Sequence, residues 1–219
     1  MSEADGAVET PAPVLRLLER DSVEVAPLLL GAVVTSCSQE GEVSVRLTEV
    51  EAYRGETDPG SHAYRGQTAR NAAMFEAAGA VYVYFTYGMH YCVNLVCGPA
   101  GLSRAVLLRA GEVVAGQELA RSRRVAARQD RDLARGPARL AQALGLSRQD
   151  DGARIGPVGS RLCLALPGPG QVDPALVRQG PRTGVSGPGG DAQRFPWRFW
   201  LEAEPSVSPY RAARPRRRS

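Results

Sequence analysis

The sequence predicts a single α+β domain with a largely antiparallel sheet. A length of 219 residues suits one domain, and an apolar fraction of 43% is enough for an ordinary hydrophobic core. Strand-like and helix-like patterns are mixed along the chain without the regular alternation that builds a parallel sheet. Two strand patterns, residues 81–86 and 90–97, flank a Tyr-Gly-Met turn that is typical of an antiparallel hairpin.

The first part of the chain predicts an arm, a broken helix and two strands. Residues 1–14 are mostly small or acidic and include prolines, so we expect a disordered arm. Residues 15–29 mix leucines with charged residues and predict helix, with a break near Asp21 and Ser22. Strands follow at 31–36 and 42–53, joined by a turn.

The second of these strands carries two acids after three apolar residues. Side chains alternate between the two faces of a strand, so Val43, Val45, Leu47, Glu49 and Glu51 share one face if no bulge intervenes. An acid in that place lies either at the rim of the sheet or in a pocket.

The later segments alternate between loops and short elements. Residues 54–72 are polar and rich in glycine, and a long loop of this kind in a compact domain is usually functional. Beyond the hairpin we expect a short strand at 105–109, helices at 112–128 and 137–144, connections at 147–160 and 167–193, a final strand at 195–202 and a basic, disordered tail at 206–219.

Composition excludes several kinds of chemistry. All 27 basic residues are arginine, so no side chain can form a Schiff base. The four cysteines form no CxxC motif and only two histidines accompany them, which argues against a zinc site and a disulfide framework. No glycine-rich stretch has phosphate-loop spacing, and no apolar run is long enough to span a membrane. We therefore expect no structural zinc site, no nucleotide cofactor and no membrane span.

Charge points to a polyanionic partner. Residues 102–139 hold nine arginines against four acids, and residues 207–219 hold five arginines and no acid. Such a distribution attracts nucleic acid, although solvated arginine-rich helices explain a formal charge of +4 equally well.

Several residues are candidates for a site, and each has an ordinary structural explanation. Glu51 suits a general base held ionised by Arg109, yet a strand-end glutamate in solvent is the commoner case. Tyr84 suits a stacking platform for a base, but tyrosines in sheets usually pack across strands. His62 and Asn94 are polar residues that can serve a ligand or simply satisfy a neighbour.

The hairpin tip is harder to explain structurally. Tyr87 stands beside Gly88 in the turn, where a large aromatic has few neighbours to pack against. This position suggests insertion into a partner such as a DNA stack, a role that Met89 would share.

The motifs around these residues resemble a known family. They are EAY at 51–53, His62, RGQTARN at 65–71, MF at 74–75, YVYFTYGM at 82–89, CVN at 92–94 and LLRA at 107–110. Their order and spacing resemble the alkyladenine (3-methyladenine) DNA glycosylases, and weaker similarity extends over residues 15–202. The chain departs from the family pattern in a slightly shorter loop between His62 and Gln67 and in His90, where some members have another aromatic residue.

The resemblance implies a fold and a set of roles. It implies a curved antiparallel sheet with surrounding helices and a hairpin that projects into DNA, within a glycosylase domain at residues 15–205. By this resemblance Glu51 is the general base and Arg109 helps hold the site. Tyr53, His62 and Tyr84 line the pocket for the flipped base, and Asn94 would clash with the exocyclic amine of guanine. Tyr87 enters the minor groove. The resemblance also implies that the protein uses no metal and no cofactor.

Three functions compete on the sequence. The favoured one is a base-excision repair glycosylase that flips alkylated or deaminated purines from double-stranded DNA and hydrolyses the N-glycosidic bond with an activated water. A non-catalytic nucleic-acid binder that uses the same hairpin and a hydrolase of free nucleosides are the others. For the favoured function we expect a monomer that, in a bacterium, works in the cytoplasm on the nucleoid.

Overall fold

The computed structural model describes residues 9–86 and 88–213. Its strands are β1 (Val33–Ser38), β2 (Gly41–Tyr53), β3 (Val81–Thr86), β4 (His90–Val96), β5 (Ala105–Ala115), β6 (Leu162–Ala165), β7 (Val177–Gly180) and β8 (Arg198–Leu201). Its helices are α1 (Ala12–Leu18), α2 (Ser22–Leu28), α3 (Gln117–Arg123) and α4 (Pro137–Leu144). Short 3₁₀ turns lie in the connections, among them Gly55–Thr57 and Ala72–Phe75.

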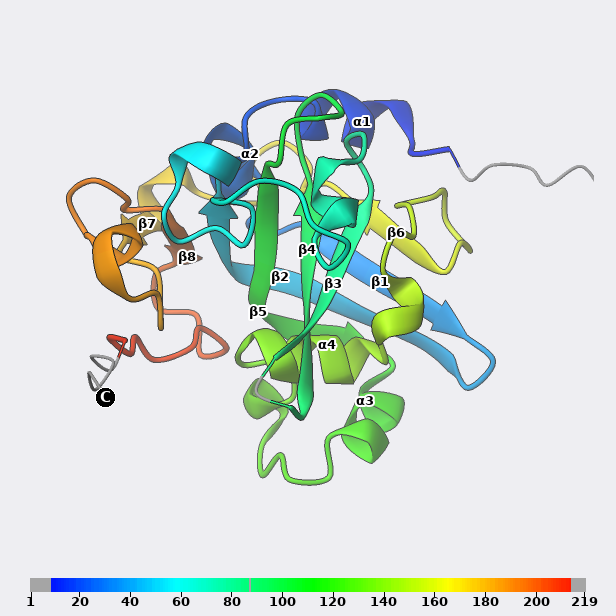
Figure 1. Ribbon diagram of the computed structural model, residues 1–219. Coiled ribbons are helices and arrows are strands. Elements are labelled where there is room, and N and C mark those ends of the chain that lie inside the picture. Colours follow the sequence, from blue (N-terminus) through cyan, green and yellow to red (C-terminus); the bar gives the residue numbers. More distant parts are fainter. Residues whose placement is uncertain (1–8, 87, 214–219) are drawn as a thin grey trace, which may run out of the picture.

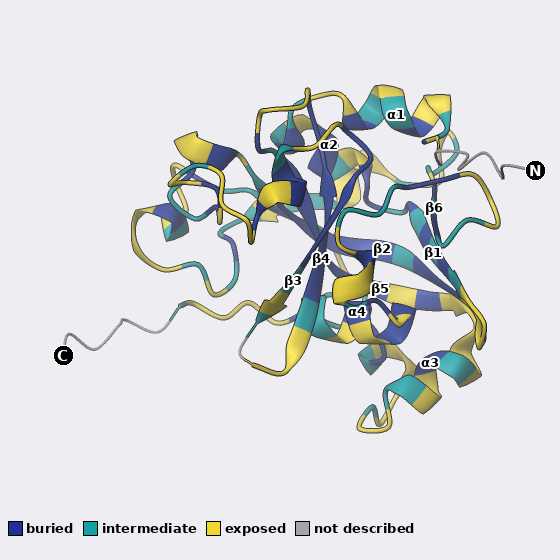
Figure 2. Ribbon diagram, turned by 45° about the vertical axis from the view of Figure 1, so that its right-hand side comes forward, coloured by how far each residue is buried: buried dark blue, intermediate teal, exposed yellow. Residues whose placement is uncertain are grey.

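The eight strands form one curved, open sheet (Figure 1). The order is β3-β4-β5-β2-β1-β6, and β8 joins the sheet by pairing with both β2 and β7. Every pair of these strands is antiparallel. In Figures 1 and 2 the β3–β4 hairpin runs down past α4, and α3 lies lower still. These observations confirm the predicted α+β fold with its antiparallel sheet and projecting hairpin.

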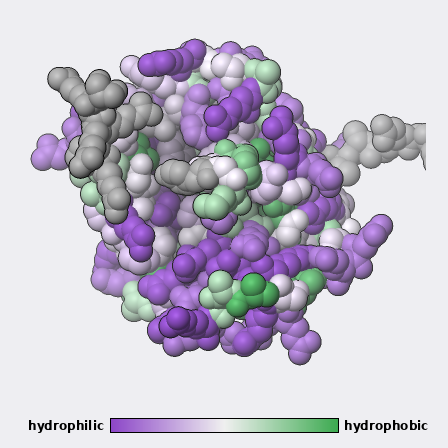
Figure 3. Space-filling view, turned by 60° about the horizontal axis from the view of Figure 1, so that its bottom comes forward, coloured by the Kyte–Doolittle hydropathy of each residue, from purple (hydrophilic) through white to green (hydrophobic). Residues whose placement is uncertain are grey.

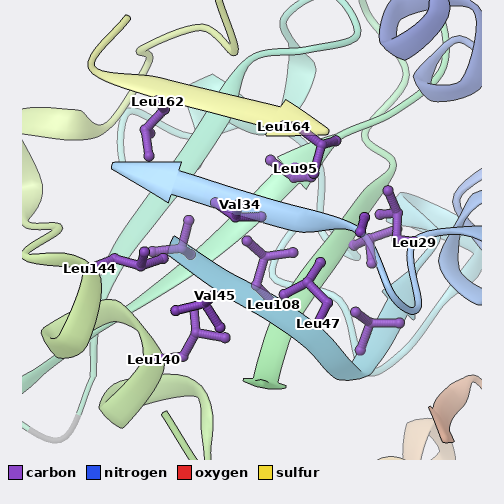
Figure 4. Close-up of a cluster of buried hydrophobic side chains, with 14 of the residues drawn as sticks. Leu29, Val34, Val45, Leu47, Leu95, Leu108, Leu140, Leu144, Leu162 and Leu164 are labelled. Atoms are coloured by element: carbon purple, nitrogen blue, oxygen red, sulfur yellow. The ribbon is translucent and has the colours of Figure 1, made fainter. Parts of the chain in front are cut away.

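The main hydrophobic core lies on one face of the sheet. Leucines and valines of β1, β2, β4, β5 and β6 pack there against Leu29 and against Leu140 and Leu144 of α4 (Figure 4). Figure 2 shows the buried strands at the centre, with exposed residues on the outer sides of the helices. A second, smaller cluster of buried apolar residues includes Tyr82 of β3 and Met74 of the turn Ala72–Phe75. The segment around Ala63 and Met74 thus covers part of the opposite face.

Three register shifts interrupt the pairing of β2 with β5, and the two beside Glu49 are bulges that change the faces of these strands. Leu47 pairs with Gly111 and Glu49 pairs with Ala110, so Thr48 is an extra residue in β2. Because Val50 then pairs with Leu108, Arg109 is an extra residue in β5. A bulge re-aims the side chains beside it.

The bulge at Thr48 decides where the two acids point. Val43, Val45 and Leu47 belong to the main core, but beyond the bulge Val50 and Ala52 take over that face. In a strand without a bulge, Glu49 and Glu51 would lie on the same face as the three apolar residues. In the structure they do not. They lie on the opposite side of β2.

The helix expected at 112–128 is wrong in its first part. β5 continues to Ala115, and the helix covers only Gln117–Arg123. Glu112 pairs with Arg46 and Val113 pairs with Val45, so a distant strand holds this stretch extended. Gly116, at φ 70°, then turns the chain; a Cβ there would collide with the carbonyl oxygen of Glu42.

Other segments agree with the sequence or extend it. The helix break is confirmed, since the Asp21 side chain accepts a hydrogen bond from Val23 N and begins α2. The helix at 137–144 is confirmed, with Pro137 at its start and Gly145 at φ 66° after its end. The connection expected at 167–193 contains a strand, β7, and β6 also forms, because both pair with strands far away in sequence.

Both expected disordered ends include ordered residues. α1 begins at Ala12, and Val14 and Thr10 are buried. At the other end Ser206 and Ser208 are buried, within the segment 206–219 that we expected to be a tail. No helix among the described residues is long and apolar enough to cross a membrane.

Candidate active site

A row of side chains crosses four strands on the face away from the main core. Tyr82 pairs with Asn94, Asn94 pairs with Leu107, and Leu107 pairs with Glu51. Directly opposed residues in an antiparallel sheet point to the same face. The register therefore brings an aromatic ring, an amide, an aliphatic side chain and a carboxylate into one line.

This row forms the floor of a cavity of about 700 Å³. The loop around Pro59 and His62 contributes to its walls, as do the segment 183–186 and the start of α4. The side chains that line it are those of Glu51, Tyr53, His62, Met74, Tyr82, Tyr84, Thr86, His90, Cys92, Asn94, Leu107, Arg109, Thr183 and Arg211, with several from the neighbouring loops. A cavity of this size holds a small-molecule fragment such as a nucleobase with its sugar.

Glu51 is fully buried beside this cavity and is held from three sides. Tyr53 donates its hydroxyl hydrogen to Glu51 Oε2 at 2.9 Å, and the backbone N–H of Thr183 donates to Oε1 at 2.7 Å. Arg109 Nε lies 3.5 Å from Oε1. Buried carboxylates need such partners, because an isolated buried charge is costly. Glu51 is thus fixed in place rather than free in solvent.

Glu49 is a second buried acid beside the site, and sequence reasoning did not single it out as a candidate site residue. It is fully buried and accepts hydrogen bonds from Arg109 Nε at 2.8 Å and from Arg198 Nε at 2.6 Å. Ser208 donates its backbone N–H at 2.7 Å and its hydroxyl at 3.0 Å. Glu49 and Glu51 with Arg109 and Arg198 form a buried group of two negative and two positive charges.

Charge in this group keeps Arg109 protonated, and burial together with charge keeps Tyr53 protonated. Burial alone would lower the pKa of Arg109, but the charges of Glu51 and Glu49 outweigh burial and raise it. Burial, followed by the charge of Glu51, raises the pKa of Tyr53 well above its ordinary value. The Tyr53 hydroxyl therefore remains a hydrogen-bond donor to Glu51.

Aromatic rings form one wall of the cavity. His62 and Tyr84 meet edge to face, with ring centres 4.5 Å apart. Tyr82 stacks on Tyr84 at 5.5 Å, and its hydroxyl lies 3.1 Å from His62 Nδ1. Burial, followed by the nearby Arg70, lowers the pKa of His62, so the ring is neutral at pH 7.

Asn94 and Arg182 support the site from within the fold. Asn94 is buried and donates from Nδ2 to the carbonyl oxygen of Tyr82 at 3.2 Å. Arg182 is fully buried behind Tyr53, with its guanidinium carbon 4.5 Å from the centre of that ring. It pairs with Asp58 through two bonds of 2.5 and 2.6 Å. A Cβ on Gly60 would lie 2.5 Å from Arg182 Nη2, so this packing requires glycine.

The structure thus brings six predicted residues to one cavity: Glu51, Tyr53, His62, Tyr84, Asn94 and Arg109. Met89 is instead strongly exposed (71%), in the turn of the hairpin. Tyr87 lies outside the described residues, and its neighbour Gly88 has φ 69°. The lower face of the molecule is mostly hydrophilic (Figure 3).

Glu49 and Arg182 were missed for different reasons. Glu49 stood in the predicted strand, two residues from Glu51, and that spacing was the available signal. Arg182 stood in a stretch predicted to be a connection, and its partner Asp58 is far away in sequence. No group of three or more His, Cys, Asp or Glu residues within 9–86 and 88–213 is arranged to hold a metal ion.

Comparison with known proteins matches this geometry to a family. The model of the methylpurine-DNA glycosylase (MPG) family matches residues 16–205. A Streptomyces avermitilis protein named "Putative 3-methyladenine DNA glycosylase" is 58% identical over 200 residues, covering 91% of this chain and 92% of that protein. Proteins of the same name from Leifsonia xyli and Frankia casuarinae are 57% and 46% identical, over 87% and 99% of this chain and 88% and 100% of their own lengths. The chain belongs to the methylpurine-DNA glycosylase family.

Proposed function

We propose that this protein is a monofunctional DNA glycosylase of base-excision repair. It takes an alkylated or deaminated purine out of duplex DNA into the cavity and hydrolyses the N-glycosidic bond with a water molecule. The observation that carries the proposal is Glu51, a buried carboxylate held by Tyr53 and Thr183 at the edge of an aromatic cavity. Its family supports the same activity.

The carboxylate suits the reaction. Cleavage of an N-glycosidic bond passes through a state with oxocarbenium character, and a nearby negative charge stabilises it. As general base, Glu51 accepts a proton from the attacking water while the purine leaves with the bonding electrons. Glu51 needs to be fixed for this role, and its bonds to Tyr53 and Thr183 fix it.

The aromatic wall suits the damaged base. Tyr53, His62 and Tyr84 line the cavity, and a cationic alkylpurine gains about 0.5–2 kcal/mol from the face of a tyrosine. Damaged bases also cost less to unstack from the duplex. Asn94 lies on the floor of the cavity, where a guanine amine would meet its rigidly held amide.

Water is the nucleophile in this proposal. The chain contains no lysine, so no side-chain amine can attack the sugar and form a Schiff base. We expect no borohydride-trappable cross-link to DNA.

The hairpin and the arginines suit a duplex. We propose that Tyr87 fills the gap left by the flipped nucleotide, with the exposed Met89 beside it. The arginines of residues 121–139 would bind phosphates. The protein would act as a monomer and, in a bacterium, on the nucleoid in the cytoplasm.

Excision from a labelled duplex tests the proposal. Duplexes carrying one hypoxanthine, one ethenoadenine or one methylated purine are incubated with the wild type and with Glu51→Gln. We expect base release by the wild type, none by the variant, and equal binding of damaged duplex by both. Release from no lesion, with tight, salt-sensitive duplex binding, would favour the non-catalytic binder. Turnover of free nucleosides alone would favour the nucleoside hydrolase.

A further inference from the structure

Residues 206–211, which we name the C-terminal strap, lie beyond the family match at 16–205. The strap is fastened along the bulged part of β2. The Ser206 and Thr48 hydroxyls are 2.9 Å apart, and Arg135 Nε donates to the carbonyl oxygen of Val207 at 2.9 Å. Ser208 binds Glu49 through its backbone N–H and its hydroxyl. Ser206 and Ser208 are buried, so this part of the strap belongs to the folded domain.

The strap is also connected to the other carboxylate of the site. The carbonyl oxygen of Arg211 accepts a hydrogen bond from the N–H of Gly184 at 2.9 Å. Gly184 follows Thr183, whose N–H donates to Glu51. One end of the strap therefore holds Glu49, and the other end holds the loop that positions Glu51.

These contacts bring Arg211 to the rim of the cavity. Arg211 is exposed and lines the cavity. Within the described ranges, its guanidinium has no hydrogen-bond or salt-bridge partner, whereas most arginines near the site are paired. Glu51 is the one acid among the described lining residues, and Tyr53 and Thr183 already bind both of its oxygens. The rim thus offers an available positive charge without a competing acid.

The sequence beyond the strap adds more positive charge. Residues 212–219 contain Arg214, Arg216, Arg217 and Arg218 and no acid. In Figures 1 and 2 the described end of the chain and the β3–β4 hairpin both lie toward the lower part of the molecule.

We propose that Arg211 binds a phosphate of the DNA strand whose nucleotide enters the cavity. The inference rests on the proposed function, because it takes the cavity as the place of the flipped nucleotide. Arginine suits this contact, since its planar guanidinium binds two phosphate oxygens at once. The strap then couples DNA binding to the position of both buried carboxylates.

The test compares two exposed arginines. Arg211→Gln and the control Arg16→Gln, on the outer side of α1, each remove one positive charge. Binding of a hypoxanthine duplex and of an undamaged duplex is measured across a salt series, both variants being made in the Glu51→Gln background to prevent turnover. We expect Arg211→Gln to weaken binding to both duplexes about tenfold and to reduce the slope of log K against log salt by about 0.9, the value for one phosphate contact. The control should change neither quantity.

Further variants separate the possible explanations. Arg211→Lys should restore most of the slope, because the charge returns. Thermal unfolding checks that each variant is folded. A slope unchanged in Arg211→Gln would overturn the proposal. If the wild type excises nothing but the slope changes, the glycosylase proposal fails and the phosphate contact stands.

Discussion

Arg109 serves two buried carboxylates: its Nε donates to Glu49 at 2.8 Å and lies 3.5 Å from Glu51. The two bulges make this arrangement possible, because Thr48 and Arg109 are the extra residues in β2 and β5. The shorter contact belongs to Glu49, so Glu49 is the main anchor of Arg109. Glu51 keeps Tyr53 and Thr183 as its closest partners.

We expect Glu49→Gln to lower the free energy of unfolding by about 3 kcal/mol, the scale for breaking a buried ion pair from one side. The variant leaves Arg109 and Arg198 buried with a single negative charge, that of Glu51. Urea unfolding followed by circular dichroism measures the change.

The matched control for Glu49 is Glu112→Gln. Glu112 pairs with Arg46 at 2.8 Å, but its side chain is 54% exposed. Exposed pairs contribute up to about 1 kcal/mol, so the control should stay below that value. Equal losses in the two variants would contradict the role of Glu49 as a buried anchor.

The lowered pKa of His62 predicts that the stability of the protein depends on pH. Its folded pKa is lowered by burial and by Arg70, so between that pKa and the unfolded value the unfolded chain binds more protons. Stability should therefore rise with pH through this window and fall as the solution is acidified below about pH 6.5. Urea unfolding at pH 7.5 and pH 5.5 measures the difference.

His62→Gln should remove this part of the acid sensitivity. His90→Gln is the matched control, since His90 is the other histidine of the chain and lies exposed on β4. If the two variants show the same pH dependence, His62 is not the group responsible.

Tyr87→Ala should lower excision from duplex DNA while leaving the free energy of unfolding unchanged. The physical reason is that nothing then fills the gap in the base stack, which costs a few kcal/mol per unstacked step. Single-turnover excision of hypoxanthine measures the effect. Val158→Ala, at a residue 94% exposed on another loop, controls for the loss of an exposed apolar side chain. Unchanged activity in Tyr87→Ala would contradict the proposal that Tyr87 fills the gap left by the flipped nucleotide.

Local sequence signals predicted the elements that local interactions stabilise. The helix at 137–144 has proline at its start and glycine after its end, and the break before α2 has Asp21 as a cap. The hairpin followed from strand patterns around Gly88. Prediction failed at β5 beyond Arg109 and at β7, because their extended form depends on pairing with β2 and β8.

By itself, the sequence determined the chemistry that is available: a carboxylate at 51 among tyrosines, arginine as the basic side chain in place of lysine, and motifs spaced as in the methylpurine-DNA glycosylase family. Only the tertiary structure decided how these groups meet. The bulges at Thr48 and Arg109 decided which side chains of β2 and β5 point to each face of the sheet. The strand register aligned Tyr82, Asn94 and Leu107 with Glu51. Contacts across more than 100 residues tied Arg182 to Asp58 and Ser208 to Glu49. Such contacts depend on the closure of long chain loops and on burial, and no local pattern encodes them.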